Sequence, residues 1–266
     1  MKIGIRFNPF RVDEKRVGLI NEFTRLLTEN KIEYFYLDET DEKPDLIAVF
    51  GGDGTILSTA EYAVENDISI LAINIGTVGF LSSFEEKDLS AAVNMIVSGS
   101  LKVKEKTALL VKTSSGETFF AVNDAVIERD KRYDGASVVA KLDFSIDGNS
   151  IYRLSADGVI ISTPTGSTAY SLSAGGVILT PNLNSFIATP ICSHSLYTRP
   201  IVYKDDSVVS IKLLENSSSS TLSVDGKCVK KLEVGDSVIV SKHPKTLKIV
   251  DCGEDFFNRL ITKLGK

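Results

Sequence analysis

The stretch Leu46-Ile47-Ala48-Val49-Phe50-Gly51-Gly52-Asp53-Gly54-Thr55 runs from five apolar residues into a turn that contains three glycines. An uninterrupted apolar run of this length is typical of a strand buried on both faces of a parallel sheet. The apolar residues that follow, over 55–65, recur at the spacing of a helix. Strand, glycine turn and helix in this order predict one unit of an α/β fold, with the turn at the carboxyl end of the strand, where such folds bind ligands.

The rest of the first hundred residues repeats this alternation. We expect further strands at 2–7, 33–37 and 70–74, and further helices at 14–29 and 89–97. In the first of these helices Ile20, Phe23 and Leu27 share one face. Alternating strands and helices predict a parallel, Rossmann-like sheet with helices on both faces. We therefore expect residues 1–100 to form an α/β domain that carries the glycine motif.

Beyond residue 100 the pattern changes to short runs of alternating apolar and polar residues, separated by turn signals such as Asp225-Gly226. The expected strands are 108–113, 118–122, 138–146, 150–154, 159–163, 208–214, 221–224, 237–240 and 247–250. They predict a β-rich, sandwich-like domain over 101–253. A helical pattern returns at 255–264, and we expect the last segment, 254–266, to pack back on the first domain.

The composition points to an ordinary globular protein of 266 residues, with 43% hydrophobic residues and a formal net charge of -5. A negative balance disfavours binding to nucleic acid or to an anionic membrane. No segment reaches the roughly 20 apolar residues of a membrane helix, and the charged start is unlike a signal peptide. The cysteines, Cys192, Cys228 and Cys252, are odd in number and widely spaced, which is typical of a reducing cytoplasm.

The glycine motif has the features of a phosphate cradle. Glycines let the backbone approach a ligand closely, and the free N–H groups at the start of the next helix attract an anion. Asp53 is unusual in such a place, because a carboxylate repels phosphate. Its position is explained if it acts as a general base on a hydroxyl or alongside Mg²⁺. The alternative is a tight turn that needs glycine only for its backbone conformation.

Two further segments carry polar groups in apolar surroundings. Asn123-Asp124 interrupts two apolar runs, and such groups are costly to bury unless something binds them. In the segment 157–176 a strand ends at Pro164 and a helix is expected from Ser167 to Ala174, with hydroxyl and N–H groups at its start. The alternatives are a bulge between strands and a well-capped helix. A serine hydrolase motif around 171–175 is incomplete, because its first glycine is replaced and its serine lies inside the expected helix.

Taken together, these segments resemble the NAD kinase family, in the family's order and over most of the chain. The matching segments are Gly51-Gly52-Asp53-Gly54-Thr55, Gly76-Thr77-Val78-Gly79-Phe80-Leu81, Asn123-Asp124, residues 157–176, residues 190–196 with Arg199-Pro200-Ile201-Val202, and Val224-Asp225-Gly226. The glycine motif alone is shared with diacylglycerol kinases, sphingosine kinases and phosphofructokinases. The long segment up to Gly176 makes the resemblance specific.

The resemblance implies Mg²⁺-dependent transfer of a phosphoryl group from ATP, or another donor, to the adenosine ribose 2′-hydroxyl of NAD. Asp53 would be the catalytic base, and it would itself contact the dinucleotide. The other residues implied in dinucleotide or phosphate binding are Gly54, Phe80, Asn123, Asp124, Lys141, Asp157, Thr168, Ala169, Tyr170, Ser171, Leu172, Ser173 and Lys227. Asn123 would bind the adenosine part, Asp124 the nicotinamide-side ribose and Asp157 the carboxamide end. No protein ligand to the metal is implied.

The chain departs from the family pattern at three positions. Asn-Asp replaces the common Asn-Glu pair at 123–124, Ser58 stands where many relatives have a basic residue, and Ser155 where some have arginine. Two other functions share parts of this pattern: a lipid or sugar kinase with the same glycine motif, and a dinucleotide-binding sensor that has lost catalysis. The resemblance also implies a homodimer or homotetramer, and it leaves open ATP against polyphosphate and NAD against NADH.

Overall fold

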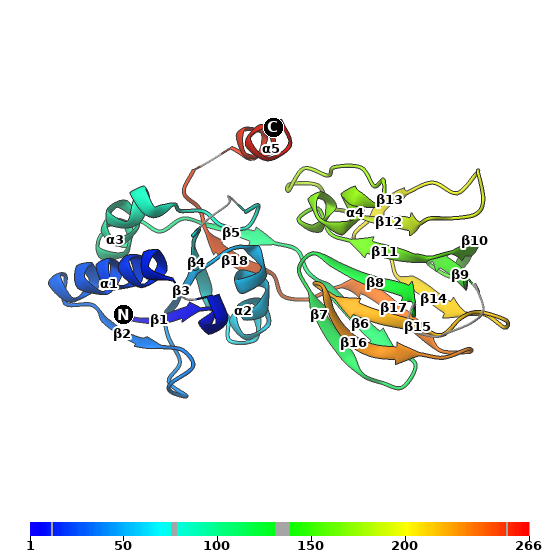
Figure 1. Cartoon of the computed structure of the whole chain (residues 1–266), viewed down its shortest axis with the longest axis horizontal. Helices are drawn as coiled ribbons and strands as arrows, with labels where there is room; N and C mark the ends of the chain where they lie inside the picture. Colours follow the sequence, from blue (N-terminus) through cyan, green and yellow to red (C-terminus); the bar gives the residue numbers. More distant parts are fainter. Residues whose placement is uncertain (12, 76–78, 131–138, 254, 266) are drawn as a thin grey trace. The chain divides into compact units, whose positions relative to one another are not determined.

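The computed structural model describes residues 1–11, 13–75, 79–130, 139–253 and 255–265. The chain folds into two compact units (Figure 1). The first consists of Met1–Lys106 together with Thr246–Lys266, and the second consists of Thr107–Lys245.

The first unit is built on a six-stranded sheet in the order β2-β1-β3-β4-β18-β5. These strands are β1 (Lys2–Phe7), β2 (Glu33–Tyr36), β3 (Leu46–Phe50), β4 (Ser69–Ile73), β5 (Val103–Lys106) and β18 (Leu247–Val250). All neighbouring pairs are parallel except β18 and β5. The parallel α/β sheet predicted from the sequence is confirmed.

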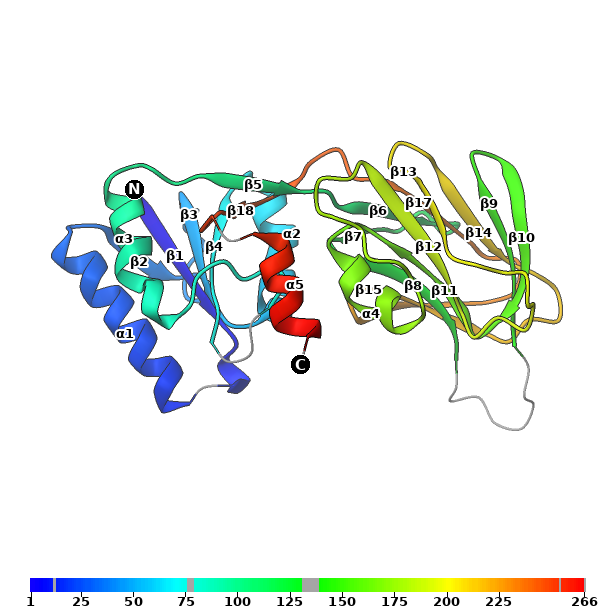
Figure 2. The ribbon, with the colours of Figure 1, turned by 90° about the horizontal axis from the view of Figure 1, so that it is seen from above.

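Helices cover both faces of this sheet (Figure 2). Helices α1 (Glu14–Glu29) and α3 (Leu89–Val97) lie on one face, and α2 (Asp53–Glu65) lies on the other. Ala48 and Phe50 of β3 belong to the core under α1 and α3. Because side chains alternate along a strand, the equally buried Ile47 and Val49 point toward α2. This two-sided burial is the reason that β3 is apolar throughout.

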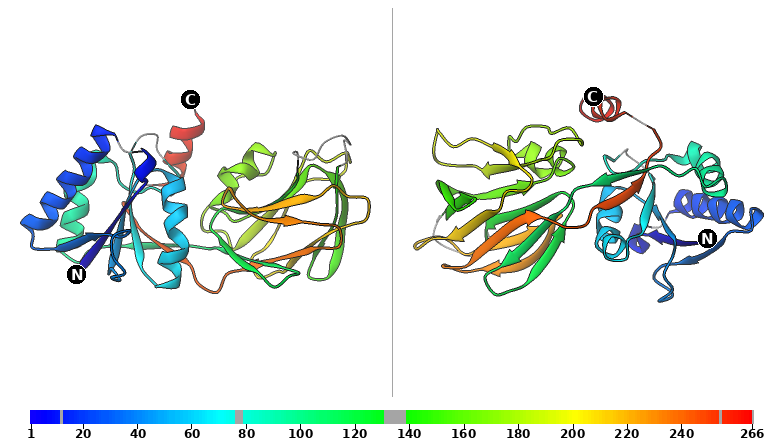
Figure 3. Two further views of the ribbon diagram at one scale, coloured as in Figure 1. Left: turned by 60° about the horizontal axis from the view of Figure 1, so that its bottom comes forward. Right: turned by 180° about the vertical axis from the view of Figure 1, so that it is seen from behind.

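The second unit is a sandwich of two antiparallel six-stranded sheets (Figure 3). One sheet contains β10 (Asn149–Ala156), β9 (Ala140–Ile146), β14 (Val209–Leu213), β17 (Ser237–Lys242), β6 (Leu109–Thr113) and β7 (Thr118–Ala121), in that order. The other contains β13 (Ile201–Lys204), β12 (Ser185–Ile191), β11 (Gly158–Ser162), β8 (Asp124–Arg129), β15 (Ser220–Val224) and β16 (Lys227–Leu232). Both sheets contribute to a single core, for example through Phe144 and Ile161. The predicted β-rich, sandwich-like second domain is confirmed as a fold class.

The expected limits of the second domain differ from the structure at both ends. Residues 101–106 and 246–253 were assigned to the β-rich domain, but β5 and β18 extend the sheet of the first unit, where Ile249 of β18 pairs with Ile70 of β4. The chain therefore enters and leaves the sandwich through two neighbouring strands of the first sheet. Their short alternating sequences carry no signal of which sheet they join. The sequence also gave no expectation of strands at β5, β12, β13 and β16.

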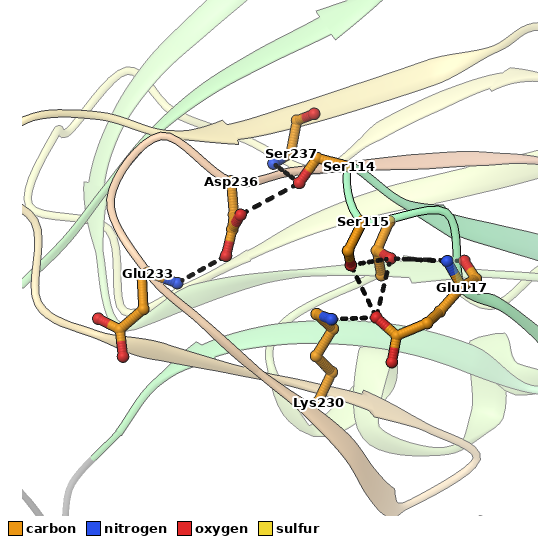
Figure 4. A network of polar contacts seen from close by, with 8 residues as sticks. Ser114, Ser115, Glu117, Lys230, Glu233, Asp236 and Ser237 are labelled. Atoms are coloured by element: carbon orange, nitrogen blue, oxygen red, sulfur yellow. Dashed lines mark hydrogen bonds and ion pairs between the residues drawn. The ribbon is translucent and has the colours of Figure 1, made fainter.

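Polar contacts join the two sheets of the sandwich at one edge (Figure 4). Glu117, before β7 of one sheet, accepts hydrogen bonds from Lys230 of β16 in the other sheet and from Ser115. Asp236 accepts a hydrogen bond from Ser114 at 3.1 Å and another from the Glu233 amide at 2.9 Å. The Glu117–Lys230 contact links β7 and β16, the edge strands of the two sheets.

The last helix, α5 (Phe256–Leu264), belongs to the first unit, as expected. Asp255 caps its N-terminus by accepting hydrogen bonds from the amides of Phe257 and Asn258. The helix contacts the loop that follows β4 through Phe80, whose ring centroid lies 6.4 Å from that of Phe256. Among the described residues, no helix combines the length and the hydropathy that crossing a membrane requires.

Candidate active site

The glycine motif forms the connection from β3 into α2. The Gly51 amide donates to the Ile73 carbonyl at 3.0 Å, which ties the loop to the neighbouring strand β4. A Cβ at position 51 would lie 2.4 Å from the Thr55 hydroxyl oxygen, so this position requires glycine. At Gly52 and Gly54, in contrast, a Cβ would meet no atom within 4 Å. The space above these two residues is open to a ligand.

Helix α2 begins at Asp53 without a side-chain cap. The amide N–H groups of its first residues, including Gly54, have no intrahelical partner by geometry, and the helix dipole gives this end a partial positive charge. An anion approaching the open space above Gly52 and Gly54 would meet these donors. The arrangement has the geometry that a phosphate cradle requires.

The Asp53 carboxylate is held by the loop that follows β4. Its two oxygens accept hydrogen bonds from the amides of Phe80, at 2.9 Å, and Leu81, at 3.1 Å. A Cβ at Gly79 would lie 1.9 Å from Oδ1 of Asp53, so only glycine lets the loop approach this closely. The side chain of Asp53 keeps 29% of its surface exposed. The carboxylate is thus oriented by the backbone and still accessible. Residues 76–78 of the predicted motif lie outside the described residues.

Two residues of α5 that the sequence analysis did not single out reach the same loop. Nζ of Lys263 lies 3.9 Å from Oδ2 of Asp53 and 4.3 Å from the centroid of the Phe80 ring. Arg259 donates to the Phe80 carbonyl at 2.9 Å. Phe80, which the resemblance implied in dinucleotide or phosphate binding, therefore donates its amide to Asp53 and has its ring under Lys263.

In the second unit, Asp225 organises the Asn123-Asp124 segment. Its carboxylate accepts hydrogen bonds from the amides of Val122, Asn123 and Asp124, at 2.8, 2.7 and 3.2 Å. Asp225 adopts a positive φ of 46° and Gly226 one of 78°, which makes the tight turn between β15 and β16. The sequence marked this turn as part of the resemblance without a role for Asp225. The Asp225 carboxylate thus satisfies three backbone N–H groups at the point where the chain passes from β7 into β8.

Asp124 is a buried carboxyl next to that of Asp225. It is only 5% exposed. Burial, and then the charge of Asp225, raises the pKa of Asp124 to about 7. Burial also raises the pKa of Asp225, against the effect of its three amide donors. Two adjoining carboxyls of this kind favour a ligand that shares hydrogen bonds with them, such as a sugar hydroxyl.

The raised pKa of Asp124 predicts a pH-dependent stability. Because the folded chain holds this proton more tightly than the unfolded chain, whose ordinary value is 3.8, the free energy of unfolding should fall as pH rises from about 4 to about 7. Asp124→Asn should remove this part of the pH dependence. The upper limit is about 4 kcal/mol, since each pKa unit corresponds to about 1.4 kcal/mol.

Thermal unfolding at pH 5 and pH 8 measures the effect. The melting temperature of Asp124→Asn relative to the unmodified chain should increase between the two pH values. Asp206→Asn, at an exposed carboxylate of the same unit, should show no such increase. Parallel curves for Asp124→Asn and the unmodified chain would contradict the assignment of a buried, protonated carboxyl.

The segment after β11 packs directly on Asn123. The hydroxyl of Thr163 donates to the Val122 carbonyl at 2.6 Å and accepts from the Gly166 amide at 3.1 Å, while the Thr163 amide donates to the Asn123 carbonyl at 2.9 Å. A Cβ at Gly166 would lie 2.1 Å from that same carbonyl oxygen. The two segments that the sequence singled out separately therefore form one structure.

Gly166→Ala should destabilise the second unit by about 1–3 kcal/mol, the usual cost of overpacking a buried position. The added methyl group would clash with the backbone carbonyl of Asn123, and moving backbone costs more free energy than rotating a side chain. Gly18→Ala is a matched control, because Gly18 is exposed in α1 and a Cβ there meets nothing within 4 Å. Chemical denaturation should show a loss for Gly166→Ala and no loss for Gly18→Ala, where alanine favours the helix. Equal stabilities would show that the loop adapts freely.

The helix expected from Ser167 to Ala174 is divided in two. The structure has a 3-10 turn, η3 (Gly166–Thr168), and a short helix, α4 (Tyr170–Ser173), separated at Ala169, whose φ and ψ are -100° and -128°. The hydroxyl of Ser167 bonds to Pro164 and Leu179 and so anchors the turn internally. The break follows from these tertiary bonds, which no local pattern reveals.

The expected binding residues of this segment differ in exposure. Tyr170 is 38% exposed and Ser173 is exposed, whereas Ser171 is fully buried and shares a hydrogen bond of 2.8 Å with Thr189. The Ser171 hydroxyl therefore forms an internal hydrogen bond and does not face solvent. Thr168, Ala169 and Leu172 are half-buried, and the Thr168 hydroxyl donates back to the Thr165 carbonyl at 3.2 Å.

Asp157 and Lys141 lie at a different place in the sandwich. In the β8–β11 pair, Asp124 stands opposite Ser162, at the far end of β11 from Asp157. Five residue steps along the strand separate Asp157 from Ser162, which is a distance of roughly 17 Å. Asp157 forms an ion pair of 2.7 Å with Arg129, and Lys141 of β9 pairs with Ser155. Asp157 thus lies apart from Asp124, while Lys227, at the start of β16, is close enough to Asp225 for its charge to oppose the raising of the Asp225 pKa by burial.

The described residues contain no group of three or more His, Cys, Asp or Glu side chains arranged to hold a metal ion. Asp53, beside the cradle, therefore belongs to no such group among these residues. A divalent cation fits this site if phosphate oxygens supply most of its ligands, as is usual for Mg²⁺.

Comparison with known families matches both parts of the chain. The model of the ATP-NAD kinase N-terminal domain matches residues 6–101, and that of the ATP-NAD kinase C-terminal domain matches residues 122–252. An NAD kinase of Carboxydothermus hydrogenoformans is 38% identical over 235 residues, covering 86% of this chain and 82% of the relative. An NAD kinase of Koribacter versatilis is 36% identical over 228 residues, covering 83% and 78%.

Solved structures show the same fold. Yeast NADH kinase complexed with NADH superposes with a TM-score of 0.86 at 28% identity, covering 99% of this chain and 87% of the other. An NAD kinase from Archaeoglobus fulgidus in complex with ATP gives a TM-score of 0.80 over 98% of both chains, at an identity of 21% that speaks for the fold alone. With both domains matched and relatives of this identity over four fifths of its length, the chain belongs to the NAD kinase family and is an enzyme with that activity.

Proposed function

We propose that this chain transfers the γ-phosphoryl group of ATP to the 2′-hydroxyl of the adenosine ribose of NAD, with Asp53 as the general base. The observation that carries this proposal is the Asp53 carboxylate, oriented by the amides of Phe80 and Leu81 at the mouth of a glycine cradle. A carboxylate held in this way repels phosphate unless it accepts a proton or shares a cation. Family membership supplies the substrates, NAD and ATP.

In the proposed step the 2′-oxygen attacks the γ-phosphorus of ATP in line with the departing oxygen of ADP. A bond forms between the ribose oxygen and the γ-phosphorus, and the bond from that phosphorus to the β,γ-bridging oxygen breaks. The hydroxyl proton passes to Asp53. The products are NADP and ADP, so atoms and charge balance without a further reactant.

The donor triphosphate is proposed to lie against the amides of Gly52 and Gly54 at the start of α2, where a Cβ would meet no protein atom within 4 Å. Mg²⁺, carried mainly by the phosphates, neutralises charge on the transferred group when bound. Polyphosphate offers the same chemistry to a backbone cradle. The donor is therefore a matter for experiment.

For the dinucleotide we propose contacts from the second unit. Asn123 is suited to the adenosine part, and the buried carboxyl of Asp124 to the nicotinamide-side ribose hydroxyls. Thr168, Ala169, the exposed Tyr170, Leu172 and Ser173 are suited to base edges and ring faces. Ser171 contributes through its backbone, because its hydroxyl is already bonded to Thr189.

Asp157 and Lys141 are proposed to contact the dinucleotide of a second copy of the chain. Roughly 17 Å of strand separates Asp157 from Asp124, by the rise of β11. This separation supports a homodimer or homotetramer. We also propose a cytoplasmic location, which the three free cysteines favour.

A coupled assay tests the proposed function. The purified chain is incubated with Mg²⁺ and every pairing of ATP or polyphosphate with NAD or NADH, and the phosphorylated product is detected with an NADP-specific dehydrogenase, after oxidation where NADH is the acceptor. Product that depends on both donor and acceptor supports the proposal. A chain that binds NAD but makes no product with any donor would be a sensor, and phosphorylation of a diacylglycerol or fructose phosphate instead would identify the other kinases.

A further inference from the structure

Lys263 is a cation that the end of the chain brings to the catalytic carboxylate. It lies in the last turn of α5, and its Nζ is 3.9 Å from Oδ2 of Asp53. The same ammonium group lies 4.3 Å from the centroid of the Phe80 ring. Two independent contacts therefore fix its position over the loop that orients Asp53.

The glycine cradle itself has little positive charge for the phosphoryl group that it is proposed to hold. Residues 51–58 contain no lysine or arginine. Ser58, on α2, is uncharged and donates its hydroxyl to the Thr55 carbonyl at 2.8 Å. Phosphoryl transfer requires positive charge near the transferred group, commonly from a lysine or arginine together with the metal ion.

The helix is placed to deliver this charge. Arg259, one turn before Lys263, donates to the Phe80 carbonyl at 2.9 Å, and Phe256 packs near the Phe80 ring. Asp255 caps the start of the helix. These contacts hold α5 on the loop while leaving the Lys263 ammonium group directed at Asp53.

The ion pair contributes little to folding. At 3.9 Å it is at the outer limit of an ion pair, and the Lys263 side chain is 28% exposed, so that solvent screens it. An ammonium group has three donors, and among the described residues its one polar contact, the long one to Asp53, leaves others available for phosphate oxygens. The position of Lys263 is thus better explained by a ligand than by stability.

We propose that Lys263 is a further catalytic residue, which binds the γ-phosphate of the donor beside Asp53 and stabilises the charge of the group in transfer. This inference rests on the proposed function. It assigns to the C-terminal helix a direct part in catalysis, in addition to packing on the first unit.

Lys263→Met tests the proposal, because methionine keeps most of the aliphatic stem and removes the charge. We expect kcat with ATP to fall about 10-fold or more, toward the lower end of the effect of losing one charge-stabilising donor, since the group is partly exposed. Lys263→Arg, which keeps the charge, should recover most of the loss. The Kd of NAD, measured by calorimetry without donor, and the melting temperature should not change.

Thr262→Ala is the matched control on the same helix, because the Thr262 hydroxyl is exposed and donates to the Asn258 carbonyl of its own helix. It should retain normal kcat. Normal kcat in Lys263→Met would overturn the proposal. So would a loss accompanied by weaker NAD binding or a lower melting temperature, which would make Lys263 a structural clamp, as would a loss that Lys263→Arg does not restore. An unmodified chain that makes no NADP would instead contradict the proposed function itself.

Discussion

Asp53→Asn should lower kcat for NADP formation by at least about 10²-fold, the usual scale of general base catalysis. The substitution keeps the size of the side chain and removes the proton acceptor. The remaining amide oxygen can still accept from the Phe80 or the Leu81 amide, so the loop should keep its place. NAD binding should therefore persist, with a Kd within a few-fold of normal, and the melting temperature should change little.

Steady-state kinetics with ATP, together with calorimetry of NAD binding, measures both parts of this expectation. Asp67→Asn is the matched control, because Asp67 is a surface carboxylate beyond the other end of α2, paired with Lys248 at 2.7 Å. It should leave kcat unchanged. Near-normal turnover in Asp53→Asn would remove Asp53 from the role of base, whatever the effect on binding.

The architecture of the first unit could be predicted because its elements carry strong local signals. The apolar run of β3, the helical spacing over 14–29 and the glycine turn at 51–54 each indicate their own structure, and together they indicate a parallel sheet. The strands β5 and β18 carry no such signal. Each is four residues long with charged members, and only their pairing with each other and with β4 assigns them to the first unit.

The candidate site was predictable where chemistry and motif coincide, and not where distant segments meet. Asp53 and Asn123 stand out because polar groups interrupt apolar runs. The role of Asp225 depends on three amides that lie more than one hundred positions earlier in the chain. Lys263 had no local feature that separates it from any other lysine on a surface helix. Contacts of this kind are tertiary, and no period or turn signal contains them.

Gly79→Ala should lower kcat by about 10²-fold without removing any catalytic group. The added Cβ would lie 1.9 Å from Oδ1 and 2.7 Å from Cγ of Asp53. The nearest atoms are the end of a side chain, so the protein relieves the clash by turning the carboxylate away from the Phe80 and Leu81 amides. Displacing a reacting group by about 1 Å commonly costs about 10²-fold in rate. Stability should change by less than about 1 kcal/mol, because a side chain rather than backbone moves.

The double variant separates this explanation from general damage to the loop. If Gly79 acts only by letting Asp53 reach its position, then Gly79→Ala should cause almost no further loss in kcat once Asp53 is already asparagine. Independent effects would multiply instead, to about 10⁴-fold, because they add as free energies. Kinetics of the two single variants and the double variant, with melting temperatures measured alongside, decides between the two. Multiplied losses, or normal activity in Gly79→Ala, would show that the close approach of the loop does not set the position of the base.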